Sequence, residues 1–451
     1  MTPTDPALMS AETLLALYAR RALSPVEALQ AVMRRVAELN PWVNAFAAMN
    51  PRAVVAAGES EARWAAGRPM GPLDGVPATV KDLLNMAGFP TRRGSRATPA
   101  EPAAEDAPAV MGLKGAGAVI VGKTTTTEFG WKTPGDCPLH GITRNPWNRE
   151  RTPGGSSSGA AVAAAEGAGF GGLGTDTGGS CRVPAALCGV TGLKPTARRV
   201  PLAGVVPLSP SLDSVGPLAP SVGCCAVLDA AISGDEAPAP PEPKPVSALR
   251  LGLPRGTFLT EDMDATVAAA FARALSRLAG AGARVEMLDL PELAELPAIN
   301  AAGGFAASEA WAWHRRLVAE KRDLYDQRIL ARIMRGERMG AAEYIDLVAA
   351  RARVAAAVAR RTAGFDAVVC PTCPVVPPAI AEVEPEAEYN RINLLLLRNT
   401  AVGNFLDRCS ISLPVHRPGE APVGLMLTGE HMADRALLAA AAGVEAALAG
   451  G

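Results

Sequence analysis

Residues 174–184 read Gly-Thr-Asp-Thr-Gly-Gly-Ser-Cys-Arg-Val-Pro, and this stretch is the most informative part of the chain. Ser180 follows two glycines, whose backbone carries no side chain and can approach a bound molecule closely. A serine behind such a backbone is typical of a nucleophile beside an oxyanion hole, the group of N–H donors that stabilises a developing negative oxygen. The stretch therefore predicts a serine-based catalytic site.

Two further segments offer partners for this serine. Residues 153–159 read Pro-Gly-Gly-Ser-Ser-Ser-Gly and place Ser156 in a similarly open backbone, and Lys81 follows the apolar run of residues 76–80. A serine hydroxyl is a poor nucleophile until a base takes its proton. A lysine can be that base if burial or neighbouring positive charge lowers its pKa from about 10.4. We predict that Lys81, Ser156 and Ser180 form one proton relay.

The same residues also have simpler interpretations. Either glycine-serine motif taken singly is compatible with a flexible turn, but both lie between apolar segments, unlike linkers. Lys81 taken singly would be interpreted as a surface lysine at the end of a strand. A phosphate-binding loop is disfavoured because Gly-x-x-x-x-Gly-Lys-[Ser/Thr] is absent, and Lys123 within Gly-Lys-Thr is expected to be structural.

Together with residues 188–196, which read Cys-Gly-Val-Thr-Gly-Leu-Lys-Pro-Thr, the two serine motifs resemble the amidase signature family. The resemblance runs from about residue 72 to 220 and resumes over residues 365–374 and 410–429. It implies an α/β fold: a single compact domain with a large mixed β-sheet sandwiched between helical layers.

The resemblance also implies roles for individual residues. Ser180 would be the acyl-forming nucleophile, Ser156 the bridging serine with a cis peptide bond, and Lys81 the base. The remaining implied site residues fall into two groups: the backbone N–H groups of the oxyanion hole are those of Thr177, Gly178, Gly179 and Ser180, and the supporting side chains are Ser157, Thr175, Asp176 and Arg182. No cofactor and no metal ion takes part in this scheme.

The implied reaction is hydrolysis of the carbon–nitrogen bond of a small-molecule carboxamide, through an acyl-enzyme, with release of ammonia or an amine. Ureido and carbamoyl compounds, of the biuret or allophanate kind, suit the same chemistry. Trp131, Asn399 and Asn404 fall where the resemblance places substrate-pocket residues. None of these residues identifies a particular amide.

Two alternatives stay open. The glutaminase subunit of a tRNA-dependent amidotransferase has the same triad and requires partner subunits; we expect a longer tail for it, which favours a free-standing hydrolase here. A non-catalytic scaffold with the same fold is the second alternative. It is disfavoured because a protein without activity has no chemical reason to keep Lys81, Ser156 and Ser180 together.

Composition limits the partners. The chain has 451 residues, 49% of them hydrophobic, and a net charge of −1, which gives no electrostatic preference for nucleic acid or an anionic membrane. No apolar run approaches the roughly 20 residues of a membrane-spanning helix, and the amino terminus lacks the pattern of a signal peptide. A small-molecule amide is the expected partner, and the resemblance makes a homodimer plausible.

Cysteine and histidine usage points to a reducing, cytoplasmic compartment without a metal site. Eight cysteines in a chain of this length do not resemble a disulfide framework. Cys370 and Cys373 form a Cys-x-x-Cys motif that has no second cysteine pair and no nearby histidine, so zinc and redox roles are disfavoured. The four histidines lack the spacing of metal ligands; they are His140, His314, His416 and His431.

We divide the single domain into four segments: a helical region over residues 1–70, the signature core over 71–233, an exposed proline-rich connector over 234–247, and a second half over 248–451 folded onto the same sheet. Ser24, Pro25 and Glu27 predict a capped helix to about residue 39. Short apolar runs predict strands at residues 76–80, 118–121, 249–253, 284–288, 367–370, 410–415 and 424–427. Helical patterns cover residues 263–280, 305–361 and the alanine-rich end of the chain.

Overall fold

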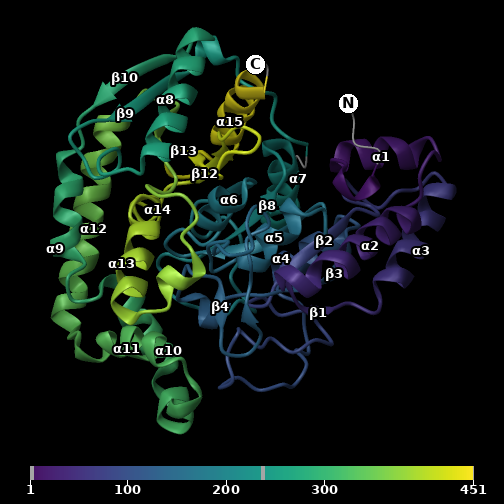
Figure 1. Ribbon diagram of the computed structural model, residues 1–451, viewed down its shortest axis with the longest axis horizontal. Helices are drawn as coiled ribbons and strands as arrows, with labels where there is room; N and C mark the ends of the chain where they lie inside the picture. Colours follow the sequence, from purple (N-terminus) through teal and green to yellow (C-terminus); the bar gives the residue numbers. More distant parts are fainter. Residues whose placement is uncertain (1–4, 235–238, 450–451) are drawn as a thin grey trace.

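The computed structural model describes residues 5–234 and 239–449, which form a single compact α/β domain around one mixed sheet of eleven strands. The strand order is β1-β3-β2-β6-β8-β7-β12-β13-β11-β9-β10. Helices α1, α2 and α3 lie toward one end of the molecule, and α9, α10, α11 and α12 lie toward the other (Figure 1).

The sheet combines parallel and antiparallel pairs. Strands β3, β2 and β6 are mutually parallel, as are β11, β9 and β10, while the strands between these two groups pair antiparallel. The strands of the sheet are β1 (Phe46–Met49), β2 (Pro77–Lys81), β3 (Val119–Thr124), β6 (Gly171–Asp176), β7 (Thr191–Lys194), β8 (Ser214–Ala219), β9 (Arg250–Pro254), β10 (Arg284–Leu288), β11 (Ala367–Pro371), β12 (Ser410–Pro414) and β13 (Gly424–Thr428). A separate pair is formed by β4 (Asp136–Cys137) and β5 (Gly141–Ile142).

Helices cover both faces of this sheet. They are α1 (Ala11–Ala19), α2 (Pro25–Val43), α3 (Ala53–Ala65), α4 (Pro108–Gly115), α5 (Ser158–Ala165), α6 (Arg182–Cys188), α7 (Val222–Ser233), α8 (Ala265–Gly280), α9 (Leu296–Ile299), α10 (Gly304–Lys321), α11 (Gln327–Met334), α12 (Ala341–Thr362), α13 (Glu386–Leu397), α14 (Thr400–Phe405) and α15 (Asp434–Ala449).

The strands alternate their side chains between two cores, because successive residues of a strand point to opposite faces. In β3, Val119 and Val121 pack with α2 and α5, whereas Ile120 between them packs with α4 and α7. In β13, Leu427 belongs to the core of α15, while Met426 packs with α12 and α14. The sheet is thus buried on both faces, which explains why its strands read as short apolar runs.

The predicted helix near residue 24 is confirmed. Ser24 Oγ accepts the backbone N–H of Glu27 at 3.2 Å, and a Glu27 carboxylate oxygen accepts the N–H of Ser24 at 2.8 Å. Each group satisfies a donor that the first turn of the helix leaves unpaired. The helix, α2, ends at Val43, four residues beyond the expected end. The first 70 residues also contain the edge strand β1, which the sequence pattern did not predict.

All seven predicted strands are present within three residues of their expected bounds, but four other strands of the main sheet were missed, β1, β6, β7 and β8, as was the short pair β4 and β5. Strand β6 reads Gly-Gly-Leu-Gly-Thr-Asp, a composition that ordinarily weakens strands. Its glycines are required by close packing, since a Cβ on Gly172 would lie 2.0 Å from Thr79 Oγ1 and one on Gly174 would lie 2.6 Å from Leu218 Cδ1. Crowding by neighbouring elements, which no local pattern reveals, selects these residues.

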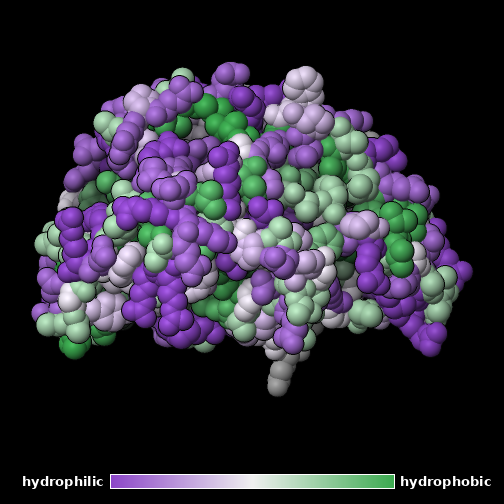
Figure 2. All heavy atoms as spheres, turned by 90° about the horizontal axis from the view of Figure 1, so that it is seen from below, coloured by the Kyte–Doolittle hydropathy of each residue, from purple (hydrophilic) through white to green (hydrophobic). Residues whose placement is uncertain are grey.

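The proline-rich connector lies only partly within the described residues, since 235–238 fall outside them. Beyond it, β12 pairs with β7 through Ser410 opposite Lys194, which brings the later strands onto the sheet of the earlier ones. Among residues 5–234 and 239–449, no helix is long and apolar enough to cross a membrane. On the face shown in Figure 2, hydrophobic residues are scattered among polar ones.

Glycine packing predicts opposite effects for two alanine substitutions. Gly58 lies in α3, and a Cβ added to it would have nothing within 4 Å, so Gly58→Ala should raise the free energy of unfolding by about 0.5–1 kcal/mol. Gly172→Ala should lower it by about 2–3 kcal/mol, because the new methyl overlaps Thr79. Urea unfolding followed by circular dichroism measures both. Equal effects of the two substitutions would contradict the packing described here.

Candidate active site

The predicted catalytic residues come from the ends of neighbouring elements. Lys81 is the last residue of β2, and Thr175 lies near the end of β6, the strand that runs parallel beside β2. Ser156 and Ser157 immediately precede α5. In open α/β sheets, ligand-binding sites form at the carboxyl ends of the parallel strands. Here the ends of β2 and β6 and the start of α5 bring these four side chains into contact.

Lys81 lies at the centre of this cluster and is completely buried. Its Nζ donates hydrogen bonds to Ser156 Oγ at 2.8 Å, Ser157 Oγ at 2.9 Å and Thr175 Oγ1 at 2.8 Å. The Gly155–Ser156 peptide bond is cis, as the resemblance implied. Lys81 forms no ion pair with a described carboxylate, so only hydroxyl groups contact its amine.

Burial lowers the pKa of Lys81 to about 7, because the charged ammonium loses its hydration. Cys181, Asp176 and Asp213 act in the opposite direction but do not restore the ordinary value. A substantial fraction of the amine is therefore neutral near pH 7. A neutral amine can accept a proton from a serine hydroxyl, which an ordinary surface lysine does rarely at this pH.

Ser180 lies between β6 and α6 and is nearly buried. Its carbonyl oxygen accepts the N–H of Ser157 at 3.2 Å, which ties the two serine loops together. Its Oγ makes no hydrogen bond to any described residue, so the step from Ser156 to Ser180 in the predicted relay is not a formed hydrogen bond in this structure. Catalytic hydrogen bonds are often long before a substrate binds.

A buried ion pair shapes the loop that holds Ser180. Arg182 Nε and Nη2 donate to the two carboxylate oxygens of Asp176 at 3.1 and 2.9 Å, and both side chains are fully buried. Arg182 also donates to Asn404 Oδ1 at 2.6 Å and to the carbonyl oxygen of Thr400 at 2.9 Å. The loop is thus fixed to α14, from the second half of the chain.

The two glycines before Ser180 have different surroundings. Gly179 has a φ of +143°, and a Cβ there would lie 2.2 Å from Thr400 Oγ1, whereas a Cβ on Gly178 would meet only Leu397 at 3.7 Å. The Gly178 carbonyl oxygen accepts the Thr400 hydroxyl at 2.6 Å. The N–H groups of both glycines donate to no described group, as an oxyanion hole requires before an oxyanion forms.

The loop opens into a cavity of about 580 Å³, whose lining includes Thr177, Gly178 and Trp131. Asn399 and Asn404, which we expected in the pocket, are not part of this lining. The Asn399 amide donates to the carbonyl oxygens of Leu259 and Pro371, and Asn404 completes the Asp176–Arg182 cluster. Both amides are bonded to buried polar groups.

Several residues of the site were not anticipated. Asp213 accepts the Thr177 hydroxyl at 2.5 Å and the N–H groups of Leu208 and Ser209, and burial raises its pKa to about 7. Thr400 donates its hydroxyl to the Gly178 carbonyl oxygen in the loop before Ser180, and Arg332 lines the cavity. No local motif marks these residues, because each acts on a segment distant in the sequence.

The other candidates have structural surroundings. Lys123 Nζ lies 2.7 Å from Asp82 Oδ1 and donates to the carbonyl oxygen of Pro90, so it is a buried structural cation as expected. His314 is buried with Nδ1 2.9 Å from the Tyr325 hydroxyl. Within the described ranges, no group of three or more His, Cys, Asp or Glu side chains could hold a metal ion.

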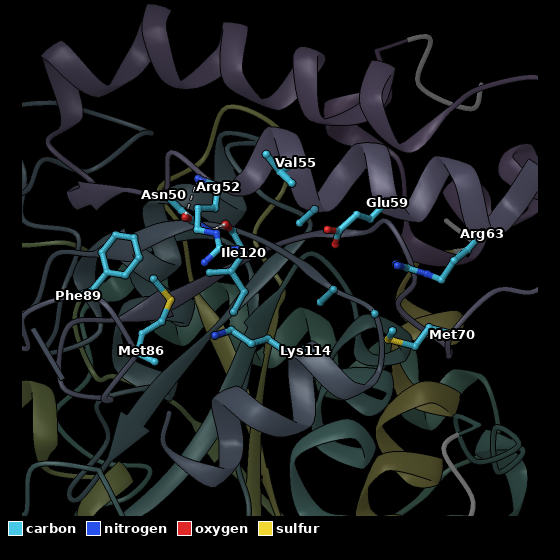
Figure 3. Close-up of a pocket in the computed structure, with 14 residues that line it drawn as sticks. Asn50, Arg52, Val55, Glu59, Arg63, Met70, Met86, Phe89, Lys114 and Ile120 are labelled. Carbon is cyan, nitrogen blue, oxygen red and sulfur yellow. Dashed lines mark hydrogen bonds between the residues drawn. The ribbon is translucent and has the colours of Figure 1, made fainter. Parts of the chain in front are cut away.

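A second cavity, of about 390 Å³, lies between α3 and α4 and contains none of the predicted catalytic residues (Figure 3). Its cations largely have carboxylate partners: Arg63 pairs with Asp74, and Lys114 pairs with Asp106. At its upper rim, the Arg52 N–H donates to Asn50 Oδ1 at 3.0 Å, and the Asn50 side-chain amide donates to the Ile120 carbonyl oxygen at 2.7 Å (Figure 3). The lining includes the Glu59 carboxylate but no serine, threonine, cysteine or histidine, so this cavity offers no hydroxyl or thiol nucleophile.

Comparisons with known proteins agree with the geometry. A family model described as Amidase matches residues 27–438. The chain is 36% identical over 437 residues to a 2-amino-5-chloromuconic acid deaminase of Comamonas testosteroni, covering 96% of this chain and 94% of the relative. It is 34% identical over 463 residues to a glutamyl-tRNA(Gln) amidotransferase subunit of Geobacter metallireducens, covering 95% of each. A crystal structure of an amidase superposes with a TM-score of 0.88 at 30% identity, covering 97% of this chain and 99% of the other.

The glycine surroundings predict that Gly178→Ala and Gly179→Ala fail for different reasons. Gly178→Ala should keep the melting temperature, since its methyl makes an ordinary contact, but should lower kcat/KM about tenfold or more by intruding on the cavity. Gly179→Ala should lower the melting temperature as well, because its φ is unfavourable and its methyl overlaps Thr400. Thermal unfolding and steady-state kinetics separate the two. A stable, fully active Gly179→Ala protein would refute this geometry.

Proposed function

This chain belongs to the amidase family and hydrolyses the carbon–nitrogen bond of small amides, and we propose that it does so by acylation of Ser180 through a Ser156–Lys81 proton relay. The observation that carries the proposal is the buried, carboxylate-free amine of Lys81 within hydrogen-bond distance of Ser156. A serine nucleophile requires a base, and this amine is poised to be one near neutral pH.

The proposed reaction begins with neutral Lys81 accepting the proton of Ser156. Ser156 in turn accepts the proton of Ser180, whose oxygen attacks the amide carbonyl carbon. The carbonyl π bond breaks toward oxygen, and the tetrahedral oxyanion is stabilised by backbone N–H groups of the loop before α6. Each such donor contributes about 2.7–4 kcal/mol to lowering a barrier of this kind.

Collapse of the tetrahedral intermediate completes the first half of the reaction. The carbon–nitrogen bond breaks as Ser156 returns a proton to the departing nitrogen, so ammonia or an amine leaves and the acyl group stays on Ser180. Water then attacks the ester carbonyl and gives its proton to the same relay. The acid product is released, and Ser180 regains its proton.

The supporting residues are proposed to position this relay. Ser157 Oγ accepts from Lys81 and donates to the Thr175 carbonyl oxygen at 3.2 Å, which fixes the amine beside Ser156. The Asp176–Arg182 pair holds the loop that presents the oxyanion-hole donors. These side chains do not exchange protons with the substrate in this scheme.

A free-standing hydrolase is favoured over the amidotransferase glutaminase, since the deaminase is 36% identical over 96% of this chain, whereas the amidotransferase relatives that align over 95–96% of it are 33–34% identical. The expected difference in tail length does not separate the two, because the alignment to the amidotransferase relative covers 95% of both chains. The name of the deaminase refers to deamination of an amino-substituted muconic acid. Ureido and carbamoyl substrates stay within the proposal.

The cellular compartment and the oligomeric state are proposed on separate grounds. All eight cysteines are buried free thiols, which supports a reducing compartment such as the cytoplasm. The homodimer stays a prediction from the resemblance.

The Lys81 pKa predicts the pH dependence of the reaction. Protonated Lys81 cannot act as a base, so kcat/KM should rise about tenfold per pH unit below pH 7 and level off above it, whereas an exposed lysine would place this rise near pH 10.4. Steady-state kinetics from pH 5 to 10 measures the profile. Asp213→Asn is the control, because burial raises the Asp213 pKa to about 7 as well. A limb that persists in that variant, with a midpoint equal to or below that of the wild type because the Asp213 charge is lost, assigns it to Lys81.

The roles of the triad are tested by ammonia release from a panel of glutamine, short aliphatic amides, aryl acetamides, and ureido and carbamoyl compounds. Ser180→Ala should abolish turnover, and Lys81→Ala and Ser156→Ala should each reduce kcat by about 10³-fold or more, with non-additive losses in combination. A fluorophosphonate probe should add mass at Ser180 in the wild type. Near-normal activity of Lys81→Ala at pH 7 would contradict the relay, and absence of labelling would favour the scaffold alternative.

A further inference from the structure

The cavity beside the oxyanion loop has a one-sided charge. Its lining contains Arg332, Arg335 and Arg398 but no aspartate or glutamate. Among residues 5–234 and 239–449, none of these arginines forms an ion pair. Leucine, phenylalanine and alanine side chains make up most of the remaining wall, so the cavity combines apolar surface with a lining whose charged side chains are all cationic.

Arg332 is the arginine whose position is tied to the candidate catalytic residues. Its Nη1 donates to the carbonyl oxygen of Trp131 at 2.9 Å, and its guanidinium carbon lies 5.3 Å from the centre of the Trp131 ring. Trp131 follows Gly130, and a Cβ on Gly130 would lie 3.4 Å from Ser156 Oγ. Arg332 is therefore held against the segment that packs on the bridging serine.

Arg332 is half-buried, and comparison with other buried or half-buried cations shows which partners it lacks. Lys132 has Asp136 and Asp326 at 2.7 and 2.8 Å, and Arg182 has Asp176. Arg351 forms no ion pair with a described carboxylate, but its guanidinium donates hydrogen bonds to three backbone carbonyl oxygens. Arg332 donates to a single backbone carbonyl oxygen, and an arginine cannot escape the cost of burial by losing its proton.

No titratable neighbour supplies the missing negative charge. Burial lowers the pKa of Arg332, and the Tyr389 phenol and the Arg335 guanidinium are the groups that act on it besides burial. Burial raises the pKa of Tyr389, so this phenol is neutral at physiological pH. Arg335 is cationic and adds to the local positive charge.

The helix that bears Arg332 is firmly anchored, so the guanidinium is presented in a fixed place. At the start of α11, the Asp326 carboxylate binds Lys132, and the Asp326 N–H donates to Glu128 at 2.8 Å. Arg328 Nη2 adds bonds to Asp326 at 2.8 Å and Asp136 at 3.2 Å. A preorganised guanidinium loses little freedom when it binds a carboxylate.

We propose that Arg332 binds a carboxylate of the substrate, so that the preferred substrates are small amides that also carry a carboxylate group, such as monoamides of dicarboxylic acids. A guanidinium with free N–H groups matches the two oxygens of a carboxylate. Arg335 and Arg398 line the same cavity and each donates to a backbone carbonyl oxygen, of Ala301 and Glu261 respectively. Their charges raise the positive electrostatic potential of the cavity, and each guanidinium has further N–H groups besides the one that donates to this carbonyl oxygen. The inference rests on the proposed amidase function and names its substrate class.

The kinetic test compares charged and neutral substrates of equal length. Monoamides of malonic, succinic, glutaric and adipic acid are paired with their methyl esters, and ammonia release gives kcat/KM for each. The wild type should prefer the acid over its ester by about 10- to 100-fold for the best chain length. Arg332→Gln should lose that preference mainly through a higher KM, while its kcat/KM for the esters stays near the wild-type value. Arg332→Lys should keep part of the preference.

Arg338→Gln is the matched control. Arg338 lies in the 3-10 helix Arg335–Arg338 that follows α11, where it is exposed, and it does not line the cavity. It removes the same charge from the protein and should keep the acid preference. Loss of activity toward acids and esters alike in Arg332→Gln would assign Arg332 a structural role and overturn the inference. A wild type that hydrolyses both classes equally would overturn it too, with the amidase function intact.

A binding measurement separates the two proposals. In Ser180→Ala protein, calorimetry should detect glutarate binding, and the Kd should rise about tenfold or more when Arg332→Gln is added. Monomethyl glutarate keeps one carboxylate and should still bind, whereas dimethyl glutarate should not. Binding that is indifferent to Arg332 would contradict the inference. Absence of turnover with every amide, together with Arg332-dependent binding, would instead contradict the amidase proposal and retain the carboxylate site.

Discussion

The buried Asp176–Arg182 ion pair is the interaction on which the site depends. Removing two charges from water is costly, and the pair is tolerated only because its remaining hydrogen-bonding groups are satisfied. Two of the groups that satisfy the pair come from a distant part of the chain, since Arg182 donates to the Thr400 carbonyl oxygen and to Asn404 Oδ1 in α14. A third is local, because the Cys181 N–H in the same loop donates to Asp176. The oxyanion loop therefore takes its shape only when the second half of the chain has packed against the first.

Desolvation has different consequences for three buried lysines. Lys123 and Lys132 contact carboxylates, which stabilise their charged form, whereas Lys81 contacts only hydroxyl groups. Burial without a counter-charge lowers the pKa of Lys81 and leaves part of its amine neutral. Burial lowers the pKa of Lys123 too, but the Asp82 carboxylate opposes that effect and binds its amine, whereas the Lys81 amine contacts hydroxyl groups.

The candidate catalytic residues could be singled out from the sequence because the two serines lie in short contiguous glycine-serine motifs between apolar segments. The predicted strands were recognisable because both faces of the sheet are buried, which requires apolar residues at successive positions. Strand β6 was not recognisable, because its glycines are required by the close approach of Thr79 and Leu218 on neighbouring strands and not by a local pattern. Asn399 and Asn404 were expected in the substrate pocket, and the structure shows their amides bonded to buried polar groups outside the lining of the large cavity; an asparagine of that kind looks, in sequence, like one that contacts a substrate.

The sequence by itself determined the order and chemical type of the reacting groups and an α/β fold class, because hydrophobic periodicity and local backbone freedom are properties of neighbouring residues. Only the tertiary structure decided which cations are paired. Arg332 meets the Trp131 carbonyl across 201 positions of sequence, and Arg182 meets Asn404 across 222. Charge state and unsatisfied hydrogen-bonding capacity depend on burial and on partners brought from elsewhere in the chain, and no local pattern specifies them.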